Sequence, residues 1–336
     1  MNNKVTIIGA GSFGSAIAQV FSDKNMEVMI YTTKQKQELE INENHTNKYY
    51  FSHLVFTNRV HATVSLNEAL LFSDLIIIAV PSEAIREVAK LINQETITPK
   101  LFVSVTKGLE PHTNKMVSEI LEEEIIAGNR KGIVILSGPS HAEEIVKRFF
   151  TTFVAVSKDL KLSEEIQQLF SNDYIRVYTS TDLIGVQLGA AVKNILAIAS
   201  GIVAGMGYGD NTKAALITRG LAEMVRYGVS KGADINTFFG LTGIGDLIVT
   251  ATSFHSRNYQ IGYKVGQGME PKQALLEMKT VVEGIRTTEA VYHDAKRNYI
   301  EMPITESVYK VFFDGYDPLQ IMDEIKNRKL KAEQID

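Results

Sequence analysis

Short apolar runs alternate with helical stretches over the first 180 residues, and this alternation constrains the possible folds more than any other feature of the chain. The run Leu75-Ile-Ile-Ile-Ala-Val80 has no polar residues at alternate positions, which is typical of a strand buried on both faces. Strands that alternate with helices predict a parallel, doubly wound sheet with right-handed crossovers. The predicted strands are Val5–Ile8, Val28–Tyr31, Leu75–Val80, Leu101–Val105, Ile133–Ser137, Phe153–Ser157 and Tyr174–Tyr178, of which the last two can extend the sheet in mixed orientation. The predicted helices are Ser12–Ser22, Ser82–Ile92, Thr113–Ile126, His141–Lys147 and Ser163–Phe170.

After Asp182 the strand signal nearly disappears. Helical patterns follow at 182–206, 213–232, 258–267, 271–279, 284–297, 304–313 and 317–328. A chain of 336 residues is long enough for two domains. We therefore predict an α/β protein with a dinucleotide-binding type of sheet domain over 1–180 and an all-helical domain over 181–336, which would bind substrate and catalyse.

A glycine motif directly follows the first predicted strand and opens the first predicted helix. In Gly9-Ala-Gly11-Ser-Phe-Gly14, the tight turn, the approach of a pyrophosphate and the packing of helix on sheet each require a glycine. The helix N-terminus adds unpaired N–H groups for phosphate. The alternative is a glycine turn that only packs a helix. In this context we predict an N-terminal Rossmann-type doubly wound sheet, with Gly9, Gly11, Ser12, Phe13 and Gly14 at the cofactor.

The end of the second predicted strand bears on the choice between NAD and NADP. An NAD-selective site usually places an acid here, where it binds the ribose 2′-hydroxyl. This strand ends Tyr31-Thr32-Thr33-Lys34, with no carboxylate to repel a 2′-phosphate. The sequence therefore permits NADP as well as NAD, with Thr33 and Lys34 as candidate contacts. Equal rates with both cofactors would leave Lys34 an ordinary exposed lysine.

A single charge interrupts the long apolar stretch from Leu183 to Met206: Lys193, followed by Asn194. A buried lysine is costly unless it is paired, lines a polar cavity or works with a shifted pKa. It is either a snorkelling lysine on an amphipathic helix or a buried amine that transfers a proton. The stretch could span a bilayer, but a central lysine opposes insertion, so we predict a buried central helix.

Two polar blocks follow predicted strands, where open α/β sheets place their ligands. They are Ser104-Val-Thr-Lys107-Gly108 and Ser137-Gly138-Pro139-Ser140. Ser140 with Glu143 also fits a capping box, in which case it only starts a helix.

Two further blocks lie in the helical half. Thr242-Gly-Ile-Gly-Asp246 presents a glycine-flanked carboxylate, and Ser256-Arg257-Asn258 presents a fork-shaped cation suited to phosphate. Taken alone, Asp246 or Arg257 is more often a surface charge.

These blocks together suggest a reaction. Hydride transfer to a carbonyl needs a proton donor at the oxygen, and none of the histidines has a convincing setting for it. A lysine whose pKa is lowered by burial and neighbouring cations can serve. Lys193 and Lys107 are candidates to share a pocket in which Asp246 holds one of them charged. The sequence predicts reduction of a small phosphorylated or carboxylated ketone.

Composition excludes several function classes. A net charge of −4 gives no basic field for nucleic acid. The absence of cysteine excludes disulfide and thiolate chemistry, and suits a reducing cytoplasm. The seven histidines form no HExxH or other close ligand pair, so no metal is expected. The apolar segment before the first glycines is too short for a signal peptide, and we expect a cytoplasmic protein.

Several blocks in order along the chain carry a family resemblance. They are GAGSFG at 9–14, SVTKGLE at 104–110, LSGPSHAEE at 136–144, RVYTSTDLIGVQLGAAVKNILAIASGI at 176–202, ALITRGLAEM at 215–224, GLTGIGDL at 240–247, HSRN at 255–258, VVEG at 281–284 and EMPIT at 301–305. Over essentially its whole length the chain resembles the bacterial-type NAD(P)-dependent sn-glycerol-3-phosphate dehydrogenases. The resemblance implies reversible reduction of dihydroxyacetone phosphate to sn-glycerol 3-phosphate, for phospholipid synthesis, in a cleft between the domains.

The resemblance also implies roles for individual residues. Lys193 resembles the general acid/base. The residues that match the family's substrate-contacting positions are Lys107, Gly138, Ser140, Lys193, Asp246, Ser256, Arg257 and Asn258. Those resembling cofactor contacts are Ser12, Phe13, Thr33, Lys34, Tyr50, Lys107, Ala142, Arg257, Val281 and Glu283. The chain departs from the family pattern at Thr32-Thr33, after Tyr50, at Ala190-Ala191 and at Arg148-Phe149-Phe150.

Three alternatives remain at this point. A related hydroxyacid dehydrogenase would act on a carboxylate, a non-catalytic NAD(P)-responsive regulator would bind without turnover, and a membrane role would use the apolar stretch. A homodimer formed through the helical domain is a further expectation. We expect the protein neither to bind nucleic acid nor to insert into a membrane.

Overall fold

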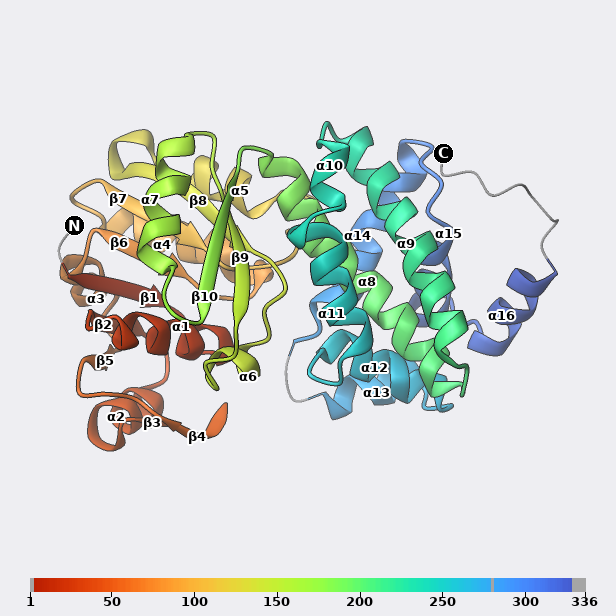
Figure 1. The fold of residues 1–336 in the computed structure, drawn as a ribbon, viewed down its shortest axis with the longest axis horizontal. Coiled ribbons are helices and arrows are strands. Elements are labelled where there is room, and N and C mark those ends of the chain that lie inside the picture. The colour runs from red at the N-terminus through yellow and green to blue at the C-terminus, as the bar shows by residue number, and fades with distance from the viewer. Residues whose placement is uncertain (1–2, 279–280, 328–336) are drawn as a thin grey trace. The chain divides into compact units, whose positions relative to one another are not determined.

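In a computed structural model, the structure describes residues 3–278 and 281–327. The chain divides into two compact units (Figure 1). The first comprises Met1–Lys107 and Lys115–Leu183, and the second comprises Gly108–Asn114 and Ile184–Asp336. Residues 328–336, which the predicted second domain includes, lie outside the described part of the chain.

The first unit is built on an eight-stranded sheet with the order β10-β9-β8-β7-β6-β1-β2-β5. Its strands are β1 (Lys4–Ile8), β2 (Glu27–Tyr31), β5 (Val60–Thr63), β6 (Leu75–Ile78), β7 (Lys100–Ser104), β8 (Arg130–Ser137), β9 (Thr151–Val156) and β10 (Ile175–Ser180). All neighbours are parallel except β8 and β9, which pair antiparallel. The predicted doubly wound parallel sheet, with mixed orientation at its last strands, is confirmed.

Helices cover both faces of this sheet. Thr6 of β1 donates to the main-chain oxygen of Ala69 on one side (2.7 Å), while its neighbour Ile7 joins the core that contains Phe21 on the other. The Phe21 and Phe170 rings meet edge to face, 4.7 Å apart, so α1 and α7 share that second side. The helices are α1 (Ser12–Asp23), α3 (Leu66–Phe72), α4 (Ile85–Glu95), α5 (Val117–Glu124), α6 (Ala142–Ile145) and α7 (Leu160–Phe170), with short 3₁₀ turns η1 (Ser82–Ala84) and η2 (Ala127–Asn129).

The segment between β2 and β6 has no predicted helix or strand, yet it is structured. It forms α2 (Gln35–Asn44), the small hairpin β3 (Thr46–Asn47) and β4 (Phe51–Val55), then β5 and α3. Only Ile41 of α2 is buried, so this helix has no apolar stripe to reveal it. The predicted helix over 113–126 is shorter than expected and begins at Val117, because the residues before it form a loop with left-handed backbone at His112 and Asn114.

The described part of the second unit is helical, as predicted. Its elements are α8 (Leu183–Gly205), α9 (Asp210–Ser230), α10 (Ile235–Phe238), the π-helical turn η3 (Leu241–Gly245), α11 (Asp246–Thr252), α12 (Arg257–Gly266), α13 (Pro271–Glu277), α14 (Glu283–Arg297), α15 (Pro303–Phe313) and α16 (Pro318–Lys326). Residues 241–252, for which no helix was predicted, form the π-helical turn η3 and the helix α11. The long helix α8 lies among α9, α11, α12 and α14 in Figure 1.

Four glycines bring α8 and α12 into main-chain contact, which we call the glycine crossing. They are Gly201 and Gly205 of α8 with Gly262 and Gly266 of α12. A Cβ atom at Gly201 would lie 2.1 Å from the main-chain oxygen of Tyr259, and one at Gly262 would lie 2.1 Å from that of Ile198. No side chain larger than hydrogen fits at these points, so the two backbones touch directly.

Two segments of the described chain are long and apolar enough to cross a membrane by composition alone, Leu183–Gly205 and Ile235–Thr252. In the first, 89% of the most apolar window is buried inside the protein. Such a segment is equally typical of a core helix, so this is weak support for a membrane role.

A buried carboxylate joins α9 to the start of α15. Glu223 is 2% exposed and accepts the N–H groups of Ile304 and Thr305, the latter at 3.2 Å, where α15 has unpaired donors. Burial nevertheless raises the pKa of this carboxyl from 4.5 to about 7, and the hydrogen bonds only partly oppose the shift. The folded state therefore binds more protons than the unfolded state between pH 4.5 and 7.

We expect stability to fall as pH rises through that window and Glu223→Gln to remove this contribution. One unit of pKa corresponds to about 1.4 kcal/mol, so the free energy of unfolding of the native chain should lose up to roughly 3 kcal/mol relative to the variant. Urea unfolding from pH 4.5 to 8 measures this, with Glu306→Gln of α15 as the control. Parallel curves for native chain and Glu223→Gln would contradict it.

Candidate functional site

The glycine motif forms the turn between β1 and α1. Gly9 has a φ of +113°, and a Cβ there would lie 2.7 Å from the main-chain oxygen of Ala79. A Cβ at Gly14 would lie 2.0 Å from the main-chain oxygen of Gly9, so glycine is needed for α1 to pack here. Gly11, which directly precedes α1, has nothing within 4 Å of such an atom. Two glycines thus serve the fold, and the third leaves open space at a helix N-terminus, which fits a pyrophosphate.

An amide network that the sequence analysis missed holds this turn in place. Asn47 is fully buried, and its Nδ2 donates to the main-chain oxygen of Ala10 (3.0 Å) and to Ser15 Oγ (2.9 Å). Gln37 Nε2 donates to the same Ala10 oxygen (2.8 Å) and to Asn47 Oδ1 (3.1 Å), while its Oε1 accepts from Thr32 (2.7 Å). The segment after β2 therefore fixes the shape of the glycine turn.

The other predicted cofactor residues of the first unit surround this turn or lie near it. Ser12 is the first residue of α1, and the Phe13 ring meets Phe153 edge to face at 6.4 Å. Tyr50 donates its main-chain N–H to the oxygen of Asn47 (3.0 Å). Ala142, 6% exposed, is the first residue of α6.

A hollow of about 660 Å³ lies beside α2 and the β3–β4 hairpin. Thr33 is exposed, and Lys34, which caps α2 and lines the hollow, holds its Nζ 5.8 Å from the centre of the Tyr49 ring. Lys36 and Lys48 line the same hollow, as do the carboxylates Glu40 and Glu43. Glu40 is engaged internally, because its Oε1 accepts from Lys48 N (2.7 Å) and Thr46 Oγ1 (3.0 Å).

The polar blocks after β7 and β8 meet, as the sheet topology predicts. Lys107 Nζ donates to the main-chain oxygen of Gly138 (2.8 Å) and to Ser140 Oγ (3.2 Å). Gly138 has a φ of +144°, which only glycine adopts readily. The capping-box interpretation of Ser140 is wrong: the residue before α6 is His141, and Ser140 Oγ donates to Gly138 O (3.0 Å).

In the second unit, Lys193 forms a buried ion pair. It is 4% exposed, so it does not snorkel, and its Nζ lies 2.6 Å from Asp246 Oδ1. The same Nζ donates to Thr250 Oγ1 (2.8 Å), which in turn donates to the main-chain oxygen of Asp246 (2.6 Å). Asp246, 1% exposed, begins α11, and Thr250 follows one helical turn later. One face of α11 therefore both orients the Lys193 ammonium on α8 and pairs with it.

An asparagine pair lies next to this lysine along α8. Asn258 Nδ2 donates to Asn194 Oδ1 (3.0 Å), and Asn258 Oδ1 accepts from Gly284 N (2.9 Å). A Cβ at Gly284 would lie 2.8 Å from the main-chain oxygen of Asn194, so glycine is required. Asn258 thus joins α8, α12 and the start of α14.

The remaining predicted residues of the second unit flank this asparagine. The exposed Arg257 donates from Nη1 to the main-chain oxygen of Val281 (3.2 Å). Ser256 caps α12 by accepting from Tyr259 N (3.2 Å), and Glu283 is the first residue of α14.

Within residues 3–278 and 281–327, no group of three His, Asp or Glu side chains is placed to hold a metal ion. The chemistry of these sites is that of ammonium, guanidinium, amide and hydroxyl groups together with a glycine turn at a helix N-terminus. A doubly wound sheet with a glycine turn at a helix N-terminus, followed by a helical unit with a buried lysine, is the architecture of a dinucleotide-dependent oxidoreductase.

Comparison with known proteins gives the family. The family models for the N-terminus and the C-terminus of NAD-dependent glycerol-3-phosphate dehydrogenase match residues 4–163 and 182–323. A glycerol-3-phosphate dehydrogenase (NAD(P)+) of Staphylococcus epidermidis is 52% identical over 330 residues, 98% of this chain and 99% of that protein. The Staphylococcus aureus enzyme of the same name is 50% identical with the same coverage. The crystal structure of glycerol-3-phosphate dehydrogenase from Coxiella burnetii has a TM-score of 0.92 at 33% identity, covering 97% of this chain and 99% of that one. The chain belongs to the NAD(P)-dependent glycerol-3-phosphate dehydrogenase family.

Proposed function

We propose that this enzyme reduces dihydroxyacetone phosphate to sn-glycerol 3-phosphate with NAD(P)H, reversibly, and so supplies glycerol 3-phosphate for phospholipid synthesis. The observation that carries the proposal is the buried Lys193 ammonium, paired with Asp246 at 2.6 Å in a chain of this family. When bound, the reduced nicotinamide supplies the hydride that reaches the C2 carbon of the ketone.

Lys193 is the proton donor in this proposal. Its Nζ gives a proton to the C2 oxygen as that oxygen gains charge. Asp246 stabilises the ammonium before transfer, and Thr250 fixes its direction through a hydrogen bond of 2.8 Å. In the reverse direction the neutral amine takes the proton from the C2 hydroxyl.

The dinucleotide is held by residues of the first unit. Gly11 leaves room for the pyrophosphate, and the first N–H groups of α1 donate hydrogen bonds to it. Lys34, with Lys36 and Lys48 around the hollow beside α2, supports acceptance of a 2′-phosphate. We infer that the enzyme uses NADPH as well as NADH.

We assign the substrate phosphate to Arg257 of the second unit, and we propose Lys107 and Ser140 of the first unit as further substrate contacts. A guanidinium offers two parallel N–H groups to a phosphate, which the point charge of a lysine cannot. Arg257→Lys should therefore raise the KM for dihydroxyacetone phosphate by about tenfold or more, the equivalent of 1.4 kcal/mol. Steady-state kinetics measure this.

The matched control is Arg226→Lys, because Arg226 also donates to a main-chain oxygen, that of Glu301 (2.6 Å). Its KM should stay at the native value. An unchanged KM in Arg257→Lys would show that this arginine does not hold the phosphate.

The experiment that tests the function is loss of reduced-nicotinamide absorbance with dihydroxyacetone phosphate, run in parallel with NADH and NADPH. Turnover supports the proposed reaction, and the ratio of the two rates reports what Lys34 and its neighbouring lysines contribute. A protein that binds the cofactor but turns over with neither would contradict the function.

We further propose a cytoplasmic enzyme that acts as a homodimer, without membrane insertion and without nucleic acid. The chain has no cysteine and a net charge of −4. Light scattering on the purified protein measures the oligomeric state, and purification without detergent tests the absence of membrane insertion.

A further inference from the structure

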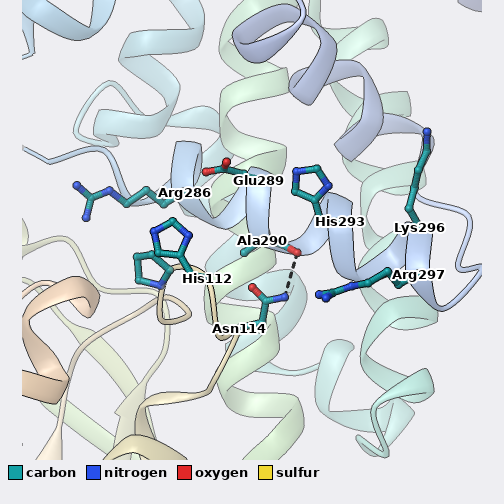
Figure 2. A pocket seen from close by; sticks show the side chains of 9 residues that line it. His112, Asn114, Arg286, Glu289, Ala290, His293, Lys296 and Arg297 are labelled. Atoms are coloured by element: carbon teal, nitrogen blue, oxygen red, sulfur yellow. Dashed lines mark hydrogen bonds between the residues drawn. The ribbon is translucent and has the colours of Figure 1, made fainter.

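A hollow of about 420 Å³ on α14 contains none of the residues assigned above to the reaction (Figure 2). Its lining comes from two segments of the second unit, the loop 111–114 and the helix α14. The volume is within the range of small-molecule sites. The residues are Pro111, His112, Asn114, Arg286, Glu289, Ala290, His293, Lys296 and Arg297.

The charges on this hollow are strongly biased. Positions 286, 289, 290, 293, 296 and 297 recur at helical spacing, so they form one stripe along α14. Among the lining residues of the stripe, Arg286, Lys296 and Arg297 are permanent cations and Glu289 is the carboxylate. Glu306 and Asp314 also act electrostatically on Lys296. Lys296 is partly engaged, because its Nζ lies 5.1 Å from the centre of the Tyr292 ring. The chain as a whole has a charge of −4, so a local excess of this kind is a feature of the site.

The loop facing the stripe is fixed in place. Asn114 Nδ2 donates to the main-chain oxygen of Ala290 (3.3 Å), the contact drawn in Figure 2. Asn114 N donates to the main-chain oxygen of Glu110 (3.0 Å), and both His112 and Asn114 have left-handed backbone. His112 is thereby presented from the loop to the end of the stripe that bears Arg286, as Figure 2 shows.

The cations fall into two groups along the helix. Arg286 and His112 mark one end, and Lys296 and Arg297, with His293, mark the other (Figure 2). Eleven residues separate Arg286 from Arg297, which is about 16 Å along a helix axis. A single phosphate cannot reach both guanidinium groups, whereas an elongated molecule can.

We propose that this hollow binds an elongated organic anion with a phosphate group at each end. One phosphate is held by Arg286 with His112, and the other by Arg297 with Lys296. Guanidinium groups suit both ends because they bind phosphate oxygens in pairs. The hollow shares no residue with the Lys193 ion pair or with the asparagine pair Asn194–Asn258. The ligand proposed here is therefore a molecule other than the substrate and the cofactor.

The test is isothermal titration of the full chain, with NADPH and sn-glycerol 3-phosphate present to fill the sites of the reaction. The probes are fructose 1,6-bisphosphate, which has two phosphates, and glucose 6-phosphate, which has one. We expect the bisphosphate to bind at least about tenfold more tightly. Arg286→Gln and Arg297→Gln should each reduce its affinity to that of the monophosphate, and Arg226→Gln should leave it unchanged.

Three outcomes would overturn the proposal: no binding of the bisphosphate, equal affinity for both probes, or native affinity in the two arginine variants. Since these readouts are heats of binding, they do not depend on turnover. Turnover without added probe should be unchanged in Arg297→Gln, which separates the loss of this site from damage to the reaction.

Discussion

Lys193→Met should lower turnover with dihydroxyacetone phosphate by about 10²- to 10⁴-fold, which is the usual share of general acid–base catalysis. Methionine nearly preserves the side-chain length but has no proton to give. The buried Asp246 then loses its cation, and breaking such a pair costs about 3–5 kcal/mol of stability. Activity and stability therefore have to be measured together, by steady-state kinetics and urea unfolding.

A second variant separates the two effects. Lys193→Met with Asp246→Asn removes the unpaired buried charge, so it should recover much of the stability while turnover stays low. Lys310→Met is the control, because this lysine pairs with Glu306 at 3.3 Å on a partly exposed face of α15. Near-native turnover in either Lys193 variant would remove the lysine from the mechanism.

Gly11→Ser should abolish most cofactor binding while leaving the fold intact. Nothing lies within 4 Å of a Cβ at this position, and its φ of −76° suits any residue. Serine is also a favourable residue before a helix, because its hydroxyl accepts the first N–H groups. Those same N–H groups are needed by the pyrophosphate, and the added atoms occupy its path. We expect the Kd for NADPH to rise at least about tenfold, or 1.4 kcal/mol.

The comparison variant is Gly14→Ser, three residues further along the same turn. There the Cβ would lie 2.0 Å from the main-chain oxygen of Gly9, so the helix must shift and the free energy of unfolding should fall by about 3 kcal/mol or more. Gly11→Ser should change that free energy by less than about 0.5 kcal/mol. Nicotinamide fluorescence titration and urea unfolding distinguish the two. Native cofactor affinity in Gly11→Ser would place the pyrophosphate elsewhere.

The sheet could be predicted from the sequence because its central strands are continuously apolar. A continuously apolar run between two helical segments is typical of a strand buried on both faces of a sheet. The segment 32–74 was not predicted, since α2 buries only Ile41 and packs its polar side chains on the glycine turn. Polar contacts between segments produce no periodic pattern of apolar residues in the sequence. Gln37 and Asn47 were missed for this reason.

The same contrast applies to the candidate site. Lys193 was found because it is the one charge in an apolar stretch, and burial of an unpaired amine is costly. Thr250 was missed because no helix was predicted over the residues that form α11. The spacing of four residues from Asp246 to Thr250 is the signal that could have found it, had the helix α11 been recognised. The cations of α14 also lie at helical spacing, but only the fold brings His112 to them.

The glycine crossing bears on which substrates the enzyme can accept. Lys193 lies two turns before Gly201 on α8, and Arg257 lies just over one turn before Gly262 on α12. Because main-chain atoms touch at the crossing, no flexible side chain lies between the two helices that could let their separation vary. The crossing therefore fixes the separation of the main-chain positions that carry the Lys193 ammonium and the Arg257 guanidinium. In the proposed reaction it selects the number of carbons between carbonyl and phosphate, and a ketone one carbon longer would have to strain or leave one end unbound.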